Sequence, residues 1–135
     1  MEAPHYSISN TNITRLEHSD VCLRSDGIIH ISIHAEQVVT TKQCEEMMDA
    51  VEALCHGKEV PIMTSIGENA VIEKEARDFS AGPRGLQFTK ADAFIVKSLA
   101  HRLIANFYLK VNKPSKPSRA FSSETEAIAW LKTYL

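Results

Sequence analysis

The chain has 135 residues, a length that holds one hydrophobic core and is short for two. Its 17 Asp and Glu residues against 15 Lys and Arg give a formal net charge of −2, so no overall positive field favours nucleic acid or an anionic membrane, and any such binding would need a local patch. The apolar share of 44% excludes an intrinsically disordered chain, and no apolar run is long enough to cross a membrane.

The beginning of the chain carries no signal for export. Residues 1–20 are polar and lack the positively charged start and the apolar stretch of a secretion signal. Three cysteines, an odd number, indicate reduced thiols rather than disulfides. We therefore expect a cytoplasmic protein in which residues 1–20 form a polar leader and residues 21–135 form one domain. The leader can add one strand, through residues 7–9 or 13–16.

Two runs of strand-forming residues follow the leader, and Asp26 and Gly27 separate them. An Asp-Gly pair readily adopts the two positive φ angles of a tight two-residue turn, so residues 21–34 are expected to form a β-hairpin. In its second strand, three isoleucines alternate with polar residues, which is typical of a strand with one buried face. His30 and His34 are then expected on the side that faces solvent.

The middle of the chain alternates between helix and strand patterns. Thr40 and Gln43 can form a capping box, and the apolar spacing over residues 44–55 predicts a helix that Gly57 ends. The next segments are expected to be a buried strand, a charged turn with a second helix, and a further buried strand: residues 59–67, 68–82 and 91–98.

A third helix is expected after Ser98, whose side chain can cap it. Its apolar residues recur three and four positions apart, and we expect this side to face the core: Ala100, Leu103, Ile104, Phe107, Tyr108 and Val111. Two prolines then end the helix. Residues 118–123 predict a last strand, and Ser123 with Glu126 predicts a capping box that opens the terminal helix.

This order of elements predicts an α/β fold. An N-terminal β-hairpin is followed by alternating helix and strand units, which favour a mainly parallel sheet with helices packed on it. The same order, over residues 21–135, is similar to the STAS domain family, which is named for sulfate transporters and bacterial anti-sigma-factor antagonists. The segments "EARDF", "KSLAHRLIANFYLKVNKPSKPSRAF" and "SSETEAIAWL" resemble more closely a group of uncharacterised small bacterial proteins with this fold.

In the antagonists, a partner kinase phosphorylates a serine in an Asp-Ser-Ser-Gly turn at the start of the second helix. The matching residues here are 72–76, Ile-Glu-Lys-Glu-Ala, so Glu75 stands where the acceptor serine would be. A carboxylate at the start of a helix interacts favourably with the helix dipole, but a kinase cannot phosphorylate it in the way that it phosphorylates serine. The resemblance therefore implies an interaction surface without the phosphorylation switch, at Glu73, Lys74, Glu75 and Arg77.

A second candidate for binding is a basic patch. Arg102 and Asn106 lie one turn apart on one face of the third helix, and Lys113 follows in a loop that its prolines hold extended. Such a patch could bind a carboxylate or a phosphate group. The alternative is a structural role, in which Arg102 pairs with an acidic residue of a neighbouring helix and Asn106 satisfies a buried backbone group.

The chain shows no motif for a metal or for catalysis. His30 and His34 have no recognisable third ligand, and Cys44 and Cys55 lie too far apart along their helix to share an ion. No cysteine or serine has the strand-turn-helix context of an activated nucleophile, and the glycines form no phosphate-binding loop. We expect no catalytic residue, no metal and no cofactor.

The sequence therefore favours a non-catalytic protein-interaction module of bacterial regulation, with a protein partner and without nucleic-acid binding or membrane insertion. The alternative is a carrier or sensor of a small ligand or lipid, in which Arg102 anchors an acidic head group beside an apolar pocket. The first strand is expected at an edge of the sheet, and such edges invite pairing, so self-association into a homodimer is also open.

Overall fold

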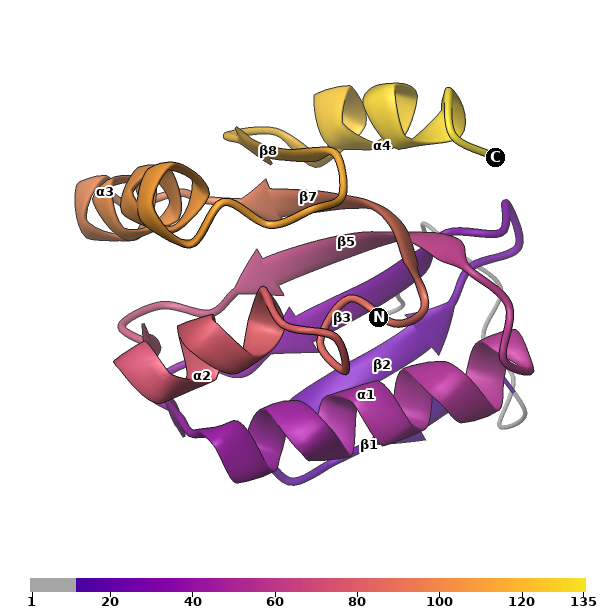
Figure 1. Ribbon diagram of the computed structural model, residues 1–135, viewed down its shortest axis with the longest axis horizontal. Coiled ribbons are helices and arrows are strands. Elements are labelled where there is room, and N and C mark those ends of the chain that lie inside the picture. Colours follow the sequence, from indigo (N-terminus) through magenta and orange to yellow (C-terminus); the bar gives the residue numbers. More distant parts are fainter. Residues whose placement is uncertain (1–11) are drawn as a thin grey trace.

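The computed structural model describes residues 12–135 and contains a central six-stranded sheet with helices on both faces (Figure 1). The strands, in their spatial order, are β1 (Ile13–Arg15), β2 (Ser19–Leu23), β3 (Ile29–Ile33), β5 (Val60–Ile66), β7 (Thr89–Ile95) and β8 (Ser118–Phe121). The first three strands are antiparallel, and the pairs from β3 to β8 are parallel. The predicted fold class, a hairpin followed by a mainly parallel sheet, is confirmed.

The leader contributes the edge strand β1, which lies in one of the two segments that the sequence offered for an extra strand. The other, residues 7–9, lies outside the described residues. The sequence did not indicate β4 (Val38–Val39) and β6 (Val71–Ile72), which pair in parallel as a separate two-stranded sheet. Two residues are too few for an alternating pattern to be visible.

The helices are α1 (Thr41–Cys55), α2 (Lys74–Ser80), α3 (Leu99–Phe107) and α4 (Glu124–Lys132), and α3 continues into one π-helical turn, η1 (Tyr108–Asn112). The predicted caps are present. The Gln43 side chain accepts from the Thr40 backbone N–H at 3.1 Å. The Ser98 hydroxyl accepts from the backbone N–H of His101 at 3.0 Å, and the Ser123 hydroxyl accepts from that of Glu126 at 3.4 Å.

Alternation along the strands divides the core between the two faces of the sheet. Helices α1 and α2 pack on one face, over the isoleucines of β3 and Ile62 of β5. Helix α4 packs on the other face, over Met63 of β5 and over Ala91, Ala93 and Ile95 of β7. Because neighbouring residues of a strand point to opposite faces, Asp92 and Phe94 of β7 lie on the face of α1 and α2.

The turn between β2 and β3 differs from the predicted two-residue turn. Only Gly27 has a positive φ, 91°, and its N–H donates to the Arg24 carbonyl at 3.0 Å, so Ser25 and Asp26 form the centre of the turn. The Asp26 carboxylate accepts from the Arg24 guanidinium at 2.7 Å and from the Ile28 N–H at 3.2 Å. These contacts favour a longer turn in which Asp26 keeps a negative φ.

His30 does not face solvent, contrary to the prediction. Its side chain is buried on the face of the sheet that α4 covers, and its Nε2 lies 2.8 Å from the Ser65 hydroxyl on β5. The alternating pattern of β3 identified the two faces of the strand correctly, but it could not show that both faces are covered. His34, near the end of the strand, is partly exposed.

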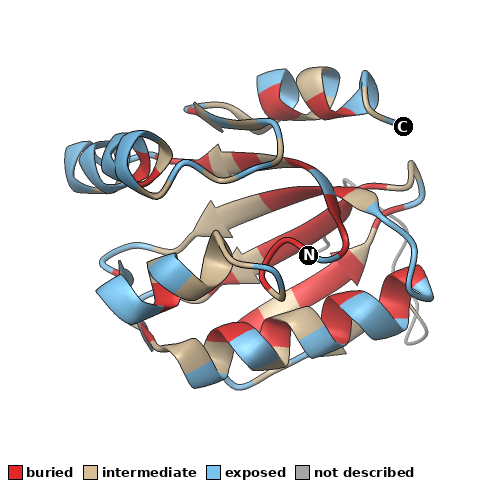
Figure 2. Cartoon of the chain, in the orientation of Figure 1, coloured by how far each residue is buried: buried red, intermediate tan, exposed pale blue. Residues whose placement is uncertain are grey.

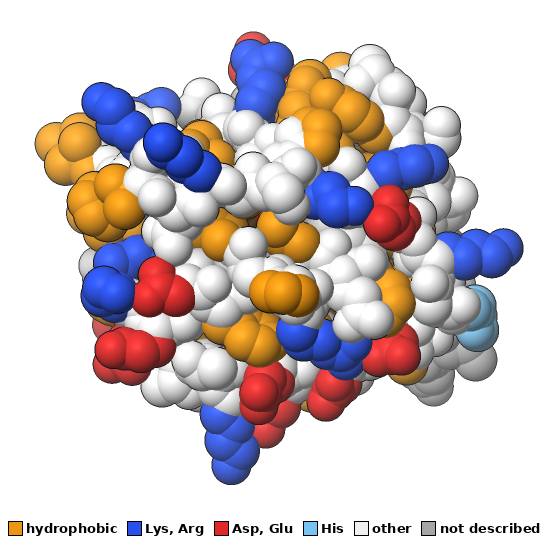
Figure 3. All heavy atoms as spheres, viewed as in Figure 1, with side chains coloured by type: hydrophobic (Ala, Val, Ile, Leu, Met, Phe, Trp, Pro, Cys, Tyr) orange, Lys and Arg blue, Asp and Glu red, His pale blue; other side chains and the backbone are white. Residues whose placement is uncertain are grey.

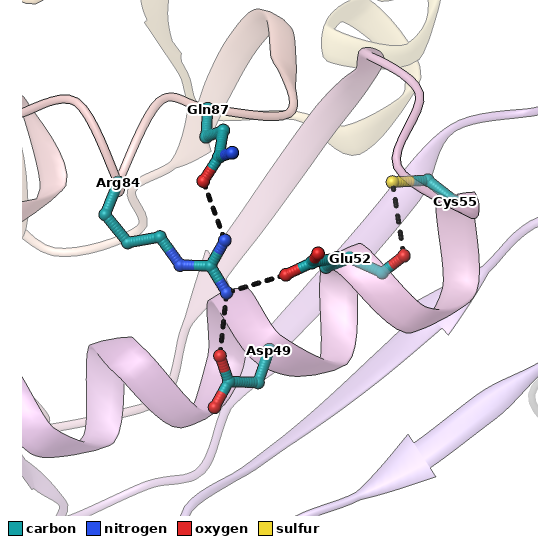
Figure 4. Close-up of polar contacts among 5 residues, drawn as sticks. All are labelled: Asp49, Glu52, Cys55, Arg84 and Gln87. Atoms are coloured by element: carbon teal, nitrogen blue, oxygen red, sulfur yellow. Dashed lines mark hydrogen bonds and ion pairs between the residues drawn. The ribbon is translucent and has the colours of Figure 1, made fainter.

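The connection between α2 and β7 is tied to α1 by one arginine. Arg84 donates to the carboxylates of Asp49 at 2.7 Å and Glu52 at 2.9 Å, one turn apart on α1, and to the Gln87 side chain at 2.7 Å (Figure 4). Beside them, the Cys55 thiol donates to the Glu52 carbonyl at 3.8 Å. Because the charged side chains are partly exposed, these contacts position the connection more than they stabilise the fold.

Helix α3 lies apart from the core, which corrects the prediction that its apolar side is buried (Figure 2). Ala105 and, in η1, Tyr108 are buried, whereas Leu103, Phe107 and Val111 are exposed. The helix has two neighbouring apolar rows, and periodicity cannot tell which of them faces the sheet.

No helix within residues 12–135 has the length and apolar character needed to cross a bilayer.

Candidate functional site

A cavity of about 870 Å³, open to solvent, lies between the sheet and helices α1, α2 and α3. Its walls are mainly apolar and include Ile31, Ile62 and Phe94 from three adjacent strands. The lining extends to Ile66 and Lys97, at and just beyond the carboxyl ends of β5 and β7. Both the volume and this place in a parallel sheet are typical of binding sites for small molecules.

The helices on this face border the cavity without filling it. Helix α2 has only seven residues, and it brings Phe79 and Ser80 to the lining. On the remaining side, α3 meets the sheet through the Tyr108 ring, which packs edge-on against Phe94 with the ring centroids 5.7 Å apart. The side chains of β7 on this face, Asp92 and Phe94, therefore form part of a cavity wall instead of a filled core.

The carboxyl group of Asp92 is the central polar feature of the cavity. It comes from the middle of β7, between two alanines that pack on the opposite face. No hydrogen bond or ion pair joins it to another residue in the described part of the chain. Burial raises the pKa of Asp92 from 3.8 to about 7, because the charged form is poorly solvated there. Near neutral pH this group can therefore act as a hydrogen-bond donor or as an anion.

Two further polar groups in the cavity walls lack a partner. The Tyr108 hydroxyl is buried and makes no hydrogen bond to any residue between 12 and 135. Burial, together with the nearby charge of Asp92, raises the pKa of Tyr108, so the hydroxyl stays protonated. Arg77 of α2 donates through Nη1 to the Ile72 carbonyl at 2.7 Å, but its buried Nε–H has no acceptor among the same residues.

Other polar groups of the cavity are already engaged. His101 Nε2 lies 2.8 Å from the Ala70 carbonyl oxygen, a contact that ties α3 to the loop before β6. The Ser80 hydroxyl donates to the Ala76 carbonyl at 2.9 Å. Burial raises the pKa of the Cys44 thiol, which keeps it in the unreactive protonated form. The cavity thus combines apolar walls with polar groups suited to holding a ligand, without an activated nucleophile.

The predicted residues at the start of α2 divide into two groups. Glu73, Lys74 and Glu75 are exposed, and Lys74 forms an ion pair with Asp78 at 2.9 Å. Arg77 instead turns toward the cavity, with its guanidinium 5.9 Å from the centre of the Phe107 ring. The exposed surface that the STAS resemblance implies therefore consists of the first three residues.

The predicted basic patch is on the outer side of α3 and beyond it. Arg102 and Asn106 are exposed, and neither side chain makes a hydrogen bond or an ion pair to another described residue, so no side-chain contact supports the structural role that the sequence left open. Arg102 is not among the residues that line the cavity. Lys113 is exposed, and its loop reaches the amino edge of the sheet, where Lys116 pairs with Glu59 at 2.9 Å.

Sequence reasoning missed Asp92 and Tyr108 as candidate site residues. The signal for Asp92 was present, because an aspartate in the middle of an apolar strand is expensive to bury and is then often functional. Tyr108 could not be separated from the core pattern of its helix. Within residues 12–135, no group of three or more His, Cys, Asp or Glu side chains is placed to hold a metal ion.

Comparison with solved structures supports the fold. An uncharacterised protein of the DUF3478 family from Shewanella loihica PV-4, which has a SpoIIAA-like fold, matches with a TM-score of 0.56 and 14% identity, over 97% of this chain and 98% of that chain. A protein of unknown function from Arthrobacter sp. FB24 is 24% identical over 87% of this chain and 95% of that chain, with a TM-score of 0.28. No curated protein matches the chain.

The first of these similarities confirms the STAS resemblance at the level of the fold, and it connects the chain with no enzyme family. The family model that matches the sequence is described as a domain of unknown function, DUF7793, and it spans residues 22–135. The chain belongs to the DUF7793 family and has a SpoIIAA-like α/β fold.

Proposed function

We propose that the protein is a non-catalytic binding module that holds one small amphiphilic molecule in the cavity between the sheet and α3. The observation that supports this proposal is the combination of an apolar cavity of about 870 Å³ with three polar groups that have no partner within the described chain. Buried polar groups without partners are costly, and a ligand that pairs with them recovers that cost.

The three groups also indicate the kind of ligand. Tyr108 and Arg77 each offer one hydrogen-bond donor, and Asp92 accepts when ionised and donates when protonated. A head group that carries an acceptor beside a donor, attached to an apolar body, would satisfy all three. The acidic head group that the sequence assigned to Arg102 would here meet Arg77 instead, because Arg77 lines the cavity.

The test uses a fluorescent apolar amine, N-phenyl-1-naphthylamine, whose emission rises in apolar surroundings. We expect saturable binding of one molecule per chain, and we expect Ala105→Phe, which places a ring in the cavity, to weaken it at least tenfold. The exposed substitution Leu103→Ser serves as a control and leaves the affinity unchanged. Equal binding by the wild type and the filled variant, with both folded, would show that the probe binds elsewhere and would refute the proposal.

A second candidate function is the protein-interaction module of bacterial regulation that the STAS resemblance implies. Two exposed valines, Val38 and Val71, lie opposite each other in the β4–β6 pair, and the exposed Glu73 and Glu75 follow β6 directly. An apolar centre with charges at its rim is typical of protein-binding surfaces.

Charge reversal tests this second function. In a pull-down from the native host, the double variant Glu73→Lys, Glu75→Lys should lose a partner that the wild type retains, whereas Glu45→Lys, a matched exposed change on α1, should keep it. If every retained protein is the same for the wild type and the double variant, this surface is not the binding surface.

A further inference from the structure

The outer side of α3 and η1 carries a row of apolar side chains that the fold leaves in solvent. Leu99, Leu103, Phe107 and Val111 are 70%, 59%, 50% and 57% exposed. The first three recur at intervals of four residues, so they stand above one another on one side of the helix. We call this row, together with the exposed cations Lys97, Arg102, Lys110 and Lys113, the α3 surface.

The segment that carries this row is also the most basic part of the chain. Residues 93–123 contain no Asp or Glu, whereas their Lys and Arg residues are Lys97, Arg102, Lys110, Lys113, Lys116 and Arg119. Of these, Lys116 is paired with Glu59, and Arg119 stacks on aromatic rings beside α4. Lys97, Arg102, Lys110 and Lys113 are exposed and have no ion pair with another described residue.

These two features lie together on the molecule. Arg102 is three residues from Leu99, and Lys110 is three residues from Phe107, so the cations border the apolar row along the helix. Figure 3 shows hydrophobic and Lys or Arg side chains gathered side by side at the left edge of the molecule, over α3. A local positive patch of this kind exists although the whole chain has a net charge of −2.

We propose that the α3 surface binds the surface of an anionic lipid bilayer. Apolar side chains in a row with cations along its border are the pattern of a helix that lies in a membrane interface, with its leucines among the acyl chains and its cations near the lipid phosphates. Asn106, which the sequence left unexplained, then lies at the polar border of this row. The proposal goes beyond the cavity ligand and stands on different residues.

The shape of the region favours a bilayer over a nucleic acid or a protein groove. Helix α3 lies at one edge of the molecule (Figure 1), so its outer side can meet a soft planar surface. Nucleic-acid phosphates would satisfy the cations but would leave four large apolar side chains in water. The cavity lies directly behind the helix, since Ala100, Ile104 and Ala105 form part of its lining. A docked α3 would therefore bring the cavity close to the lipid.

The experiment measures flotation of the full chain with vesicles of phosphatidylcholine alone and of phosphatidylcholine mixed with an equal part of phosphatidylglycerol. We expect binding to the anionic vesicles only, and weaker binding as salt is added. The double variant Lys110→Gln, Lys113→Gln should bind about twenty-fivefold less tightly, because each cation near such a surface contributes about fivefold. Leu99→Ser, Leu103→Ser should lose binding at all salt concentrations.

A matched variant separates this surface from general charge. The double variant Lys42→Gln, Lys58→Gln removes two exposed lysines outside the α3 surface, and it should bind as the wild type does. Because all substituted side chains are exposed, the thermal midpoint should stay unchanged, and circular dichroism checks that each variant is folded.

Three outcomes would overturn the proposal. One is that the wild type does not float with anionic vesicles. Another is that Lys42→Gln, Lys58→Gln weakens vesicle binding as much as Lys110→Gln, Lys113→Gln does. The third is a wild-type dimer in light scattering that Leu99→Ser, Leu103→Ser converts to a monomer, which would make the α3 surface an interface between copies of this chain.

Discussion

The substitution Asp92→Asn tests whether the cavity wall holds a carboxyl group at a cost to the fold. The change removes the charge and keeps the shape of the side chain. Burial raises the pKa of this carboxyl from 3.8 to about 7, and no hydrogen bond from another described residue offsets that burial. The ionised form is therefore less stable in the folded chain than in the unfolded chain.

The size of the effect follows from the shift. Below about pH 4 the group is protonated in both states, and its contribution to stability is fully retained. As pH rises toward 7, the unfolded chain ionises but the folded chain resists, so stability falls. A shift of roughly three pKa units corresponds to a total loss of about 4 kcal/mol by pH 7, of which about 2 kcal/mol falls between pH 5 and pH 7.

The assay is urea unfolding followed by circular dichroism at about pH 5 and pH 8. The difference between Asp92→Asn and the wild type cancels the pH dependence that both proteins share, and it should grow by about 3 kcal/mol in favour of the variant. Asp78→Asn is the control: hydrogen bonds from Lys74 and Asn112 lower the pKa of that exposed carboxyl, so it is ionised in the folded and the unfolded chain at both pH values, and its difference from the wild type should not change. If the difference for Asp92→Asn does not change with pH, the carboxyl is solvated and the reasoning is wrong.

Three further changes have expected outcomes. Tyr108→Phe removes a buried hydroxyl that has no partner among the described residues, so the thermal midpoint should stay the same or rise, and a clear fall would reveal a hydrogen bond. Gly67→Ala would place a Cβ 2.5 Å from the backbone nitrogen of Ala35, so it should destabilise the fold by about 2 kcal/mol in urea unfolding, and a neutral result would mean that the two segments can separate. Burial acts to raise the pKa of Asp26, but hydrogen bonds from Arg24 and Ile28 outweigh it, so the net pKa of this carboxyl is lowered. The stability that Asp26 contributes is therefore present above about pH 4 and is lost as pH falls below that value. Asp26→Asn should destabilise the fold by about 2 kcal/mol at neutral pH, because it removes the charge from the hydrogen bonds with Arg24, and a variant as stable as the wild type would contradict this.

The features that the sequence predicted well depend on local chemistry. The capping residues Thr40, Ser98 and Ser123 begin their helices as expected, because a side chain satisfies the free N–H groups of a helix start whatever surrounds it. The hairpin formed where the Asp-Gly pair indicated, although its turn is longer. The alternation of helices and strands predicted a mainly parallel sheet, because few topologies connect such units.

The features that the sequence missed depend on which distant elements pack against a residue in the folded chain. His30 looked exposed because a polar residue in an alternating strand usually faces water, and only the packing of α4 on that face buries it. Asp92 and Tyr108 belong to different elements, β7 and η1, and only the packing of these elements brings both to the same cavity. The predicted binding residues Arg77 and Arg102 were assigned to surfaces by the STAS resemblance and by helical spacing, respectively, and neither determines which arginine turns inward.

In helix α3, apolar periodicity predicted the wrong buried side, and the reason for this error points to a function of the exposed side. A helix that packs on a sheet from one side needs one apolar row, and α3 with η1 meets that need with Ala105 and Tyr108. The second row, from Leu99 to Val111, stays in solvent, and polar residues there would cost the fold almost nothing. Stability therefore gives no reason for four large apolar side chains bordered by cations. Binding to a lipid surface gives one, since it buries the apolar row and pairs the cations in a single step.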